Sequence, residues 1–233
     1  MNKSLNEIIK LHKKNNQTVS IGIVWSFNFN KKFNDIDILI LHNWNKGSFL
    51  KEIKKKYWDY KIIDDSLRLK IDNTEFWLVY KNHKSFLNTI LKIINWKNID
   101  RVNKEWAIWG YLPEILLNDL HNMNIIYDNN LKISKLKNNL KDYPINFKNN
   151  LLRSLKSEIL IKYDFYIKSK WFNKNLAFYD INIAIIRYLY CINNIFFSWI
   201  KHMDENIFNN KDREIIKHIK NGSELTKYIN FIL

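Results

Sequence analysis

The strand signals of this chain are confined to its first part, and this distribution limits the folds open to it. Two continuous runs of β-branched residues and one alternating pair around Asp72-Asn73 predict four strands: Thr18–Trp25, Asp35–Leu41, Ser66–Ile71 and Glu75–Tyr80. After about residue 104 such signals nearly stop, apart from a short one at 124–128, and three long helical stretches follow: about 145–170, 176–203 and 210–230. We therefore expect an α+β chain, with a small α/β domain over residues 1–130 and a helical domain over residues 131–233.

Glycine and cysteine are both scarce, and their scarcity excludes several classes of site. The chain has four glycines, where average usage would give roughly 16. No GxGxxG or GxxxxGK[ST] pattern can be written, so dinucleotide-binding and Walker-type phosphate loops are excluded. The single cysteine forms neither an internal disulfide nor a cysteine-rich zinc site, which favours a cytoplasmic setting.

The formal net charge is +15, and two explanations of it remain open. A basic surface favours anionic partners such as nucleic acid or nucleotides. However, 33 of the 38 basic residues are lysine, and abundant Lys, Asn and Ile with little Gly, Pro, Ala and Arg is typical of an AT-rich genome. The most apolar window, Ile181–Ile200, contains Arg187 and several asparagines, so we expect no membrane-spanning helix.

Two aspartates open the second predicted strand. Because successive side chains of a strand project to opposite faces, Asp35 and Asp37 share one face while the isoleucines between and after them pack on the other. Two adjacent carboxylates repel each other, and Mg²⁺ with its preference for hard oxygen ligands resolves that repulsion. The alternative is that both aspartates are ordinary solvated residues at the end of a strand.

The order of these features resembles the nucleotidyltransferase domain of the DNA polymerase β-like superfamily. A buried strand, a polar loop, an Asp-x-Asp that opens a second strand and an acid on a later strand follow one another in both. The chain is similar in particular to small bacterial proteins, antibiotic nucleotidyltransferases among them, that join a minimal nucleotidyltransferase domain to a helical one. Further segments carry the likeness: Ile125–Asp128, Tyr143-Pro144, and Leu189–Asn193 with Phe196, Phe197 and Lys201. The resemblance implies a small mixed-sheet domain followed by an α-helical bundle.

The resemblance also implies a reaction, the transfer of a nucleoside monophosphate from an Mg²⁺-bound nucleoside triphosphate to a hydroxyl or phosphate acceptor. Asp35 and Asp37 would bind the metal, and Glu75 would be the third carboxylate. The other implied roles are phosphate contact by Ser26, nucleotide binding by Lys201 and Asn193, and a position near the acceptor for Asp180. The last three residues have ordinary alternatives: Lys201 as a solvated lysine, Asn193 as a structural amide and Asp180 as a helix N-cap.

Several residues depart from the family pattern. Trp25 stands where the family has glycine before Ser26, and Trp77 stands at the expected third aspartate, two residues after Glu75. Glu75 could take that place only if the register of its strand slips by two residues. Three functions therefore stay open. The first is an active nucleotidyltransferase, whose acceptor the charge of +15 predicts not to be a cationic drug. The second is a catalytically degenerate relative that serves as a binding or regulatory module, as in a toxin–antitoxin or defence pair. The third is a basic nucleic-acid-binding protein in which the aspartates are incidental.

Overall fold

The computed structural model describes residues 3–24, 35–43, 55–57, 60–63, 66–71, 73–97, 112–197, 229 and 232. The chain divides into two compact units. The first comprises residues 1–93 and 98–141, and the second comprises 94–97 and 142–233. The first unit thus continues about a dozen residues beyond the domain limit that the sequence predicts at residue 130.

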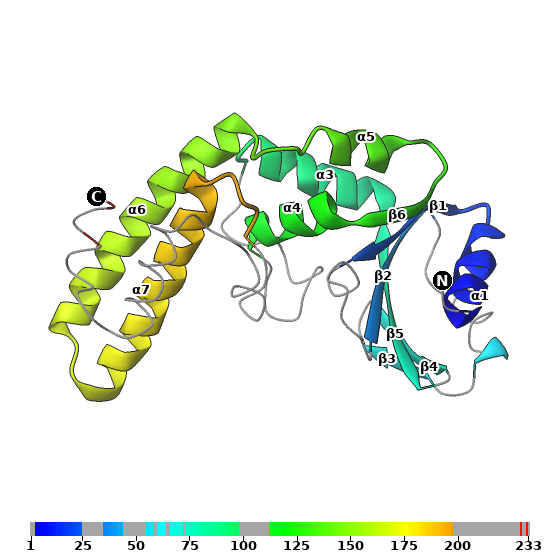
Figure 1. Ribbon diagram of the computed structural model, residues 1–233, viewed down its shortest axis with the longest axis horizontal. Coiled ribbons are helices and arrows are strands. Elements are labelled where there is room, and N and C mark those ends of the chain that lie inside the picture. Colours follow the sequence, from blue (N-terminus) through cyan, green and yellow to red (C-terminus); the bar gives the residue numbers. More distant parts are fainter. Residues whose placement is uncertain are drawn as a thin grey trace. The chain divides into compact units, whose positions relative to one another are not determined.

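A six-stranded mixed sheet forms the first unit, with the strand order β3-β4-β5-β2-β1-β6 (Figure 1). Its strands are β1 (Thr18–Val24), β2 (Asp35–His42), β3 (Tyr60–Ile63), β4 (Ser66–Ile71), β5 (Thr74–Asn82) and β6 (Asn124–Asp128). β2 and β5 run parallel, whereas the other neighbouring pairs are antiparallel. The α+β class that the sequence predicts is confirmed.

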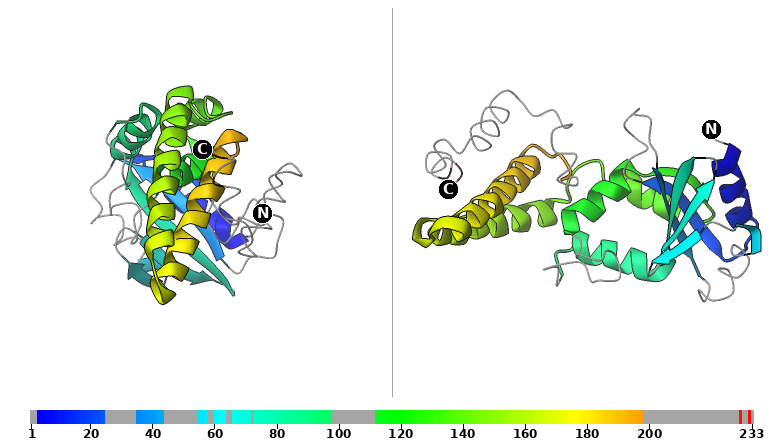
Figure 2. Two further views of the ribbon diagram at one scale, coloured as in Figure 1. Left: turned by 90° about the vertical axis from the view of Figure 1, so that its left-hand side faces the viewer. Right: turned by 90° about the horizontal axis from the view of Figure 1, so that it is seen from below.

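Helices lie on both sides of this sheet. The first unit contains α1 (Lys3–Lys13), α3 (His83–Ile94, without its last residue), α4 (Pro113–Asn122) and α5 (Lys132–Asn138). α1 lies on one side, and α3 and α4 lie on the other (Figures 1 and 2). Pro113 suits the first turn of α4, where its missing N–H has no intrahelical partner to lose.

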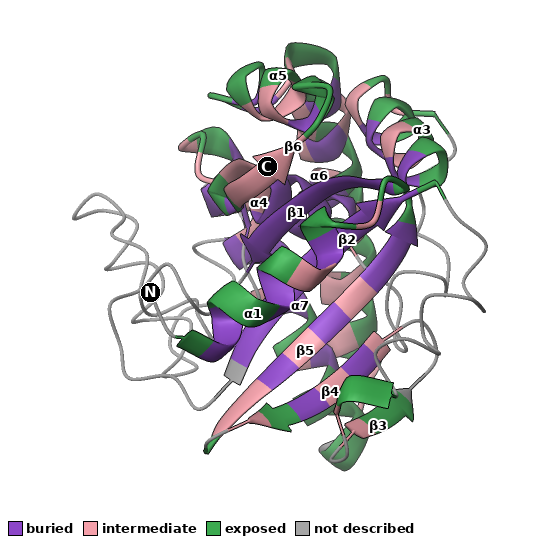
Figure 3. Ribbon diagram, turned by 90° about the vertical axis from the view of Figure 1, so that its right-hand side faces the viewer, coloured by how far each residue is buried: buried purple, intermediate pink, exposed green. Residues whose placement is uncertain are grey.

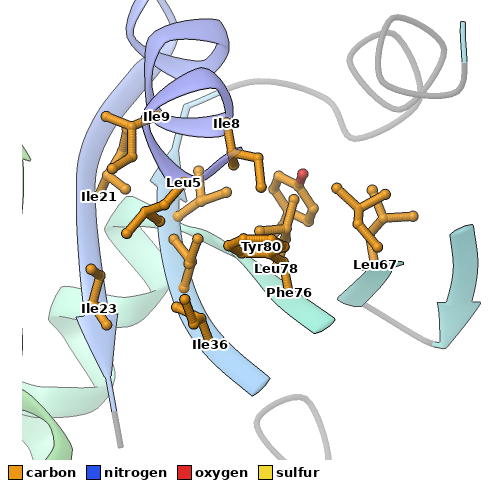
Figure 4. Packing of buried hydrophobic residues seen from close by; sticks show 13 residues of the cluster. Leu5, Ile8, Ile9, Ile21, Ile23, Ile36, Leu67, Phe76, Leu78 and Tyr80 are labelled. Carbon is orange, nitrogen blue, oxygen red and sulfur yellow. The ribbon is translucent and has the colours of Figure 1, made fainter. Parts of the chain in front are cut away.

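The face of the sheet under α1 is an apolar core, which we call the apolar face. Leu5, Ile8 and Ile9 of α1 point toward the strands, as Figure 4 shows. The strand residues of this core are Ile21, Ile23, Ile36, Ile38, Ile40, Leu67, Leu69, Phe76, Leu78 and Tyr80. They occupy alternate positions, so β5 shows buried and half-buried residues in turn (Figure 3).

The opposite face packs closely around a glycine. Gly22 in β1 lies against the side chain of Met123, the residue that follows α4, and a Cβ at position 22 would collide with the Met123 thioether. The lack of a side chain at Gly22 therefore lets the end of α4 approach the strand.

The second unit is built on two long antiparallel helices, α6 (Ile145–Lys168) and α7 (Trp171–Ile192), which lie side by side (Figure 2). The buried residues between the two helices are apolar: Ile159, Ile181, Ala184, Ile185 and Leu189. Ile229 and Ile232 belong to the same cluster. Arg187 of α7 also donates to Glu158 of α6, with 3.2 Å between Nη1 and Oε2.

The structure differs from the sequence prediction in the start of α7 and in two additional elements. α7 begins at Trp171, so Asp180 lies inside the helix and the expectation that it is an N-cap is wrong. No Pro or Gly interrupts residues 171–180, and the helix therefore starts earlier than the apolar pattern predicts. β3 and α5 are elements that the sequence analysis did not predict. Among the described residues, no helix is long and apolar enough to cross a membrane.

Candidate functional site

The parallel pairing of β2 with β5 brings three acidic positions to one corner of the sheet. Asp35 lies in register opposite Glu75, and Asp37 lies opposite Trp77. For Asp35 the structure describes the backbone position alone. Residues in register on neighbouring strands share a face, so Asp37 and Glu75 lie on the face opposite the apolar one. Trp77, and not Glu75, lies beside Asp37, so the slip of two residues by which Glu75 could take the third position is absent from this register.

Asp37 is buried, with 7% of its surface exposed. Its neighbour in β1 is Val24, which is also buried. Burying a carboxylate is costly unless its charge is compensated, so a buried aspartate at this position depends on favourable interactions with its surroundings. Trp25 and Ser26 follow Val24 directly in the chain and lie outside the described residues.

Arg68 occupies the next strand of the same face. The register aligns Arg68, Trp77, Asp37 and Val24 across β4, β5, β2 and β1, and we call these four residues the polar row. The Arg68 guanidinium lies over the Trp77 indole, with its Cζ 4.1 Å from the ring centroid. It also forms an ion pair with Glu75, with 3.6 Å between Nη1 and Oε1. A cation therefore lies between the predicted third carboxylate and the solvent-exposed edge of the sheet.

Two hydrogen-bond donors of the polar row have no acceptor. Nε of Arg68 and Nε1 of Trp77 are buried, and neither donates a hydrogen bond in the structure. Leaving a buried donor unsatisfied costs about 1–3 kcal/mol. Such groups require an explanation, and a ligand that supplies acceptors is one of the recognised ones.

The donor chemistry of this corner fits Mg²⁺. Asp37 and Glu75 provide the carboxylate oxygens that this ion prefers, and Asp35 would add another. Among the described side chains, no group of three His, Cys, Asp or Glu residues could hold a metal ion. The predicted ligand set includes Asp35, whose side chain is outside that description. The predicted metal site therefore stays a prediction.

The structure describes this corner without the remaining predicted site residues. Ser26 and Lys201 lie outside the described residues, and Asp180 and Asn193 belong to the second unit. Asn193 directly follows α7, and its Nδ2 donates to the Leu189 carbonyl at 2.8 Å, which is a structural role at a helix end. Asp180 is exposed on α7.

A second polar group, which sequence reasoning missed, lies beneath α1. His12 Nδ1 lies 2.7 Å from the Ile8 carbonyl and must donate to it, so Nε2 accepts from the Tyr80 hydroxyl at 3.1 Å. Burial lowers the pKa of His12 to about 4, and the hydrogen bond to Ile8 opposes this only in part. The pair is a closed hydrogen-bonded unit within the core, which indicates a structural role.

Another polar group lies at the end of the sheet away from the acidic corner. Asp128 Oδ2 accepts from both the backbone N and the Oγ of Ser134, at 2.7 and 2.8 Å. His83 lies nearby, and its pKa is lowered by burial and by Lys132, against the opposing effect of Asp128. Because Ser134 is bonded to the aspartate and not to the histidine, the group does not have the order of a Ser-His-Asp triad.

Comparison with known proteins yields little beyond this geometry. No family model matches the chain, and no curated protein is similar to it in sequence. Among solved structures, the chain is similar to a nucleotidyltransferase-like protein from Exiguobacterium sibiricum 255-15, with 11% identity and a TM-score of 0.47. The similarity covers 99% of this chain and 71% of that one. A likeness at this level assigns neither a family nor an activity.

Proposed function

We propose that the first unit binds an Mg²⁺-bound nucleoside triphosphate at the acidic corner and transfers its nucleoside monophosphate to a hydroxyl or phosphate acceptor. The observation that carries this proposal is the register of β2 and β5. Asp35 lies opposite Glu75, and Asp37 lies two residues after Asp35 in β2. Strand pairing makes this corner rigid, and rigid placement of acidic groups is what a metal–phosphate site requires.

In the proposed reaction an acceptor oxygen attacks the α-phosphorus, and the bond to pyrophosphate breaks. Asp35 and Asp37 would hold the divalent cation, which neutralises charge on the triphosphate when bound. Glu75 would receive the proton of an acceptor hydroxyl. Of the two acidic side chains that the structure describes at this corner, Asp37 is buried and Glu75 is half-exposed.

A second candidate function is a nucleotide-binding module without transfer. It is favoured by the ion pair between Arg68 and Glu75, since the carboxylate proposed to receive the proton is already paired with a guanidinium. Trp77, in register with Asp37, likewise supplies an indole where catalysis would use a carboxylate. This module would keep metal and nucleotide binding through Asp35 and Asp37.

The first test is calorimetric titration with ATP, GTP, CTP and UTP, each with Mg²⁺ and with EDTA. We expect the wild type to bind at least one nucleotide only with Mg²⁺, and Asp37→Asn to bind it roughly 10- to 100-fold more weakly. Asp164→Asn makes the same chemical change at an exposed position of α6 and should bind like the wild type. Equal affinity of the wild type and Asp37→Asn contradicts the proposal, and salt-sensitive binding of RNA or DNA in place of nucleotide favours the nucleic-acid-binding alternative.

A second measurement separates transfer from binding. Pyrophosphate release is followed with nucleotide labelled in its β- and γ-phosphates, for the wild type and Glu75→Gln. A transferase releases pyrophosphate, and Glu75→Gln slows the release with little change in nucleotide affinity. Nucleotide binding without any release by the wild type identifies the binding module.

A further inference from the structure

Arg68 is held in place from two directions. The Trp77 ring supports one face of the guanidinium at 4.1 Å, and Glu75 lies 3.6 Å from Nη1. Arg68 and Trp77 face each other across β4 and β5, and Glu75 lies two residues before Trp77, opposite Lys70. A planar guanidinium stacked on an indole loses little further freedom when it binds a ligand.

The donors around this arginine exceed the acceptors. A guanidinium carries five N–H groups and accepts no hydrogen bond. Glu75 is its ion-pair partner in the structure, while Arg68 Nε and Trp77 Nε1 remain without acceptors. The Arg68 side chain is 37% exposed, while its Nε is buried. A ligand group that complements this position must be rich in acceptor oxygens.

The geometry points to Arg68 as the residue that binds an anionic oxyacid group, phosphate or carboxylate, on the acceptor. This inference rests on the proposed function, in which Glu75 receives the proton of the acceptor hydroxyl. Because Arg68 pairs with Glu75, its cation lies beside the carboxylate that would receive the proton of the acceptor. A cationic acceptor would be repelled there, and an uncharged one would leave the surplus donors unmatched.

The atoms of the reaction balance with such an acceptor. Its hydroxyl oxygen bonds to the α-phosphorus, its proton passes to Glu75, and pyrophosphate leaves with the electrons of the broken P–O bond. Arg68 takes no part in bond making. It positions the acceptor through two parallel N–H···O contacts, the arrangement in which arginine binds phosphate and carboxylate most specifically.

Three small molecules test the inference: glycerol 3-phosphate, glycerate and glycerol. Their binding is measured by ligand-observed NMR in EDTA without nucleotide, for the wild type, Arg68→Gln, Arg68→Lys and Arg153→Gln. Arg153 is exposed on α6 of the second unit, so its substitution removes the same charge away from the sheet. Glycerol 3-phosphate and glycerate distinguish a phosphate from a carboxylate.

We expect at least one of the two anions to bind the wild type and Arg153→Gln alike, and Arg68→Gln at least about 10-fold more weakly. Arg68→Lys should lie between, since it keeps the charge and loses the planar fork. Equal loss in both arginine-to-glutamine variants, or equal binding of glycerol and the anions, overturns the inference. So does an Arg68→Gln variant that loses Mg·ATP affinity and keeps anion affinity, because the arginine would then face the nucleotide. Anion binding that depends on Arg68, without Mg·NTP binding by the wild type, would reject the proposed function alone.

Discussion

The two faces of one sheet use neighbouring residues in opposite ways. On the apolar face, Phe76 is fully buried, and the buried polar pair His12 and Tyr80 satisfies its hydrogen bonds within the core. On the other face, Trp77 is half-buried, stacks with Arg68 and keeps an indole N–H without an acceptor. The His12–Tyr80 pair is thus hydrogen-bonded within the core, whereas the Arg68 Nε and Trp77 Nε1 donors of the polar row have no acceptor among the described residues.

The difference indicates where stability and binding are separated in this unit. Burial of a large apolar side chain contributes about 1.5–3 kcal/mol, so the apolar face contributes much of the folding free energy. A half-exposed ion pair such as Arg68–Glu75 contributes about 0–1 kcal/mol. Arg68 and Glu75 can therefore be changed with limited cost to the fold, which makes them suitable for testing function.

The largest effect is expected from truncation in the apolar face. Phe76→Ala should lower the free energy of unfolding by about 3–5 kcal/mol, because it removes a ring that is 0% exposed and leaves a cavity. Trp77→Ala, one residue along the same strand, should cost about 2 kcal/mol because its ring is only half-buried. Urea denaturation of both variants measures the difference. An equal loss would show that the two faces do not differ in this way.

A pH effect follows from the closed pair beneath α1. The pKa of His12 is lowered to about 4 from 6.5, so the unfolded chain takes up the proton first as pH falls. The contribution of His12 to the free energy of unfolding is fully present above pH 6.5 and is lost as the pH falls toward 4. At about 1.36 kcal/mol for each pKa unit, the loss amounts to ~3 kcal/mol. Urea denaturation between pH 4 and 8 should show this decline in the wild type and a flatter profile in His12→Gln. Parallel profiles would contradict the assigned tautomer and burial.

A smaller effect should appear where α4 approaches the polar side of the sheet. In Gly22→Ala the new Cβ must displace the Met123 side chain, and overpacking of this kind costs about 1–3 kcal/mol. Because the Met123 side chain is flexible, we expect a value near the lower limit. Thermal unfolding measures the change, and a variant as stable as the wild type would show that this face is packed more loosely than the structure indicates.

The smallest effect is expected at Arg68. Arg68→Gln removes a half-exposed ion pair and a cation–π contact, and should lower the free energy of unfolding by less than about 1 kcal/mol. Urea denaturation of the variant gives the number. A loss as large as that of Phe76→Ala would assign the polar row to stability and remove the contrast between the faces.

Local patterns in the sequence predict much of the sheet. The turn signal Asp72-Asn73 in the sequence and the alternation on either side predict a pairing of Ile71 with Thr74, and hence of Arg68 with Trp77, which the structure has. The register therefore contained a signal for the Arg68–Trp77 contact that sequence reasoning did not use. The apolar positions Ile36, Ile38 and Ile40 also lie on the buried face as predicted.

Contacts between distant segments are what the sequence could not provide. His12 and Tyr80 are 68 positions apart, and nothing in either local pattern indicates their hydrogen bond. The burial of Asp37 depends on the parallel pairing of β2 with β5 and on β1 beside it, which local periodicity does not determine. The short elements β3 and α5 form through contacts with their neighbours more than through propensity.

The most direct test of the central claim is the stabilisation of the protein by Mg·NTP. A ligand that binds the folded state adds about 2.7 kcal/mol to the free energy of unfolding at 100 times its Kd. Urea denaturation with and without the best-bound Mg·NTP should show this gain in the wild type and in His12→Gln, on the apolar face, and little or none in Asp37→Asn, on the polar row. A gain of the same size in Asp37→Asn would contradict the assignment of nucleotide binding to the acidic corner.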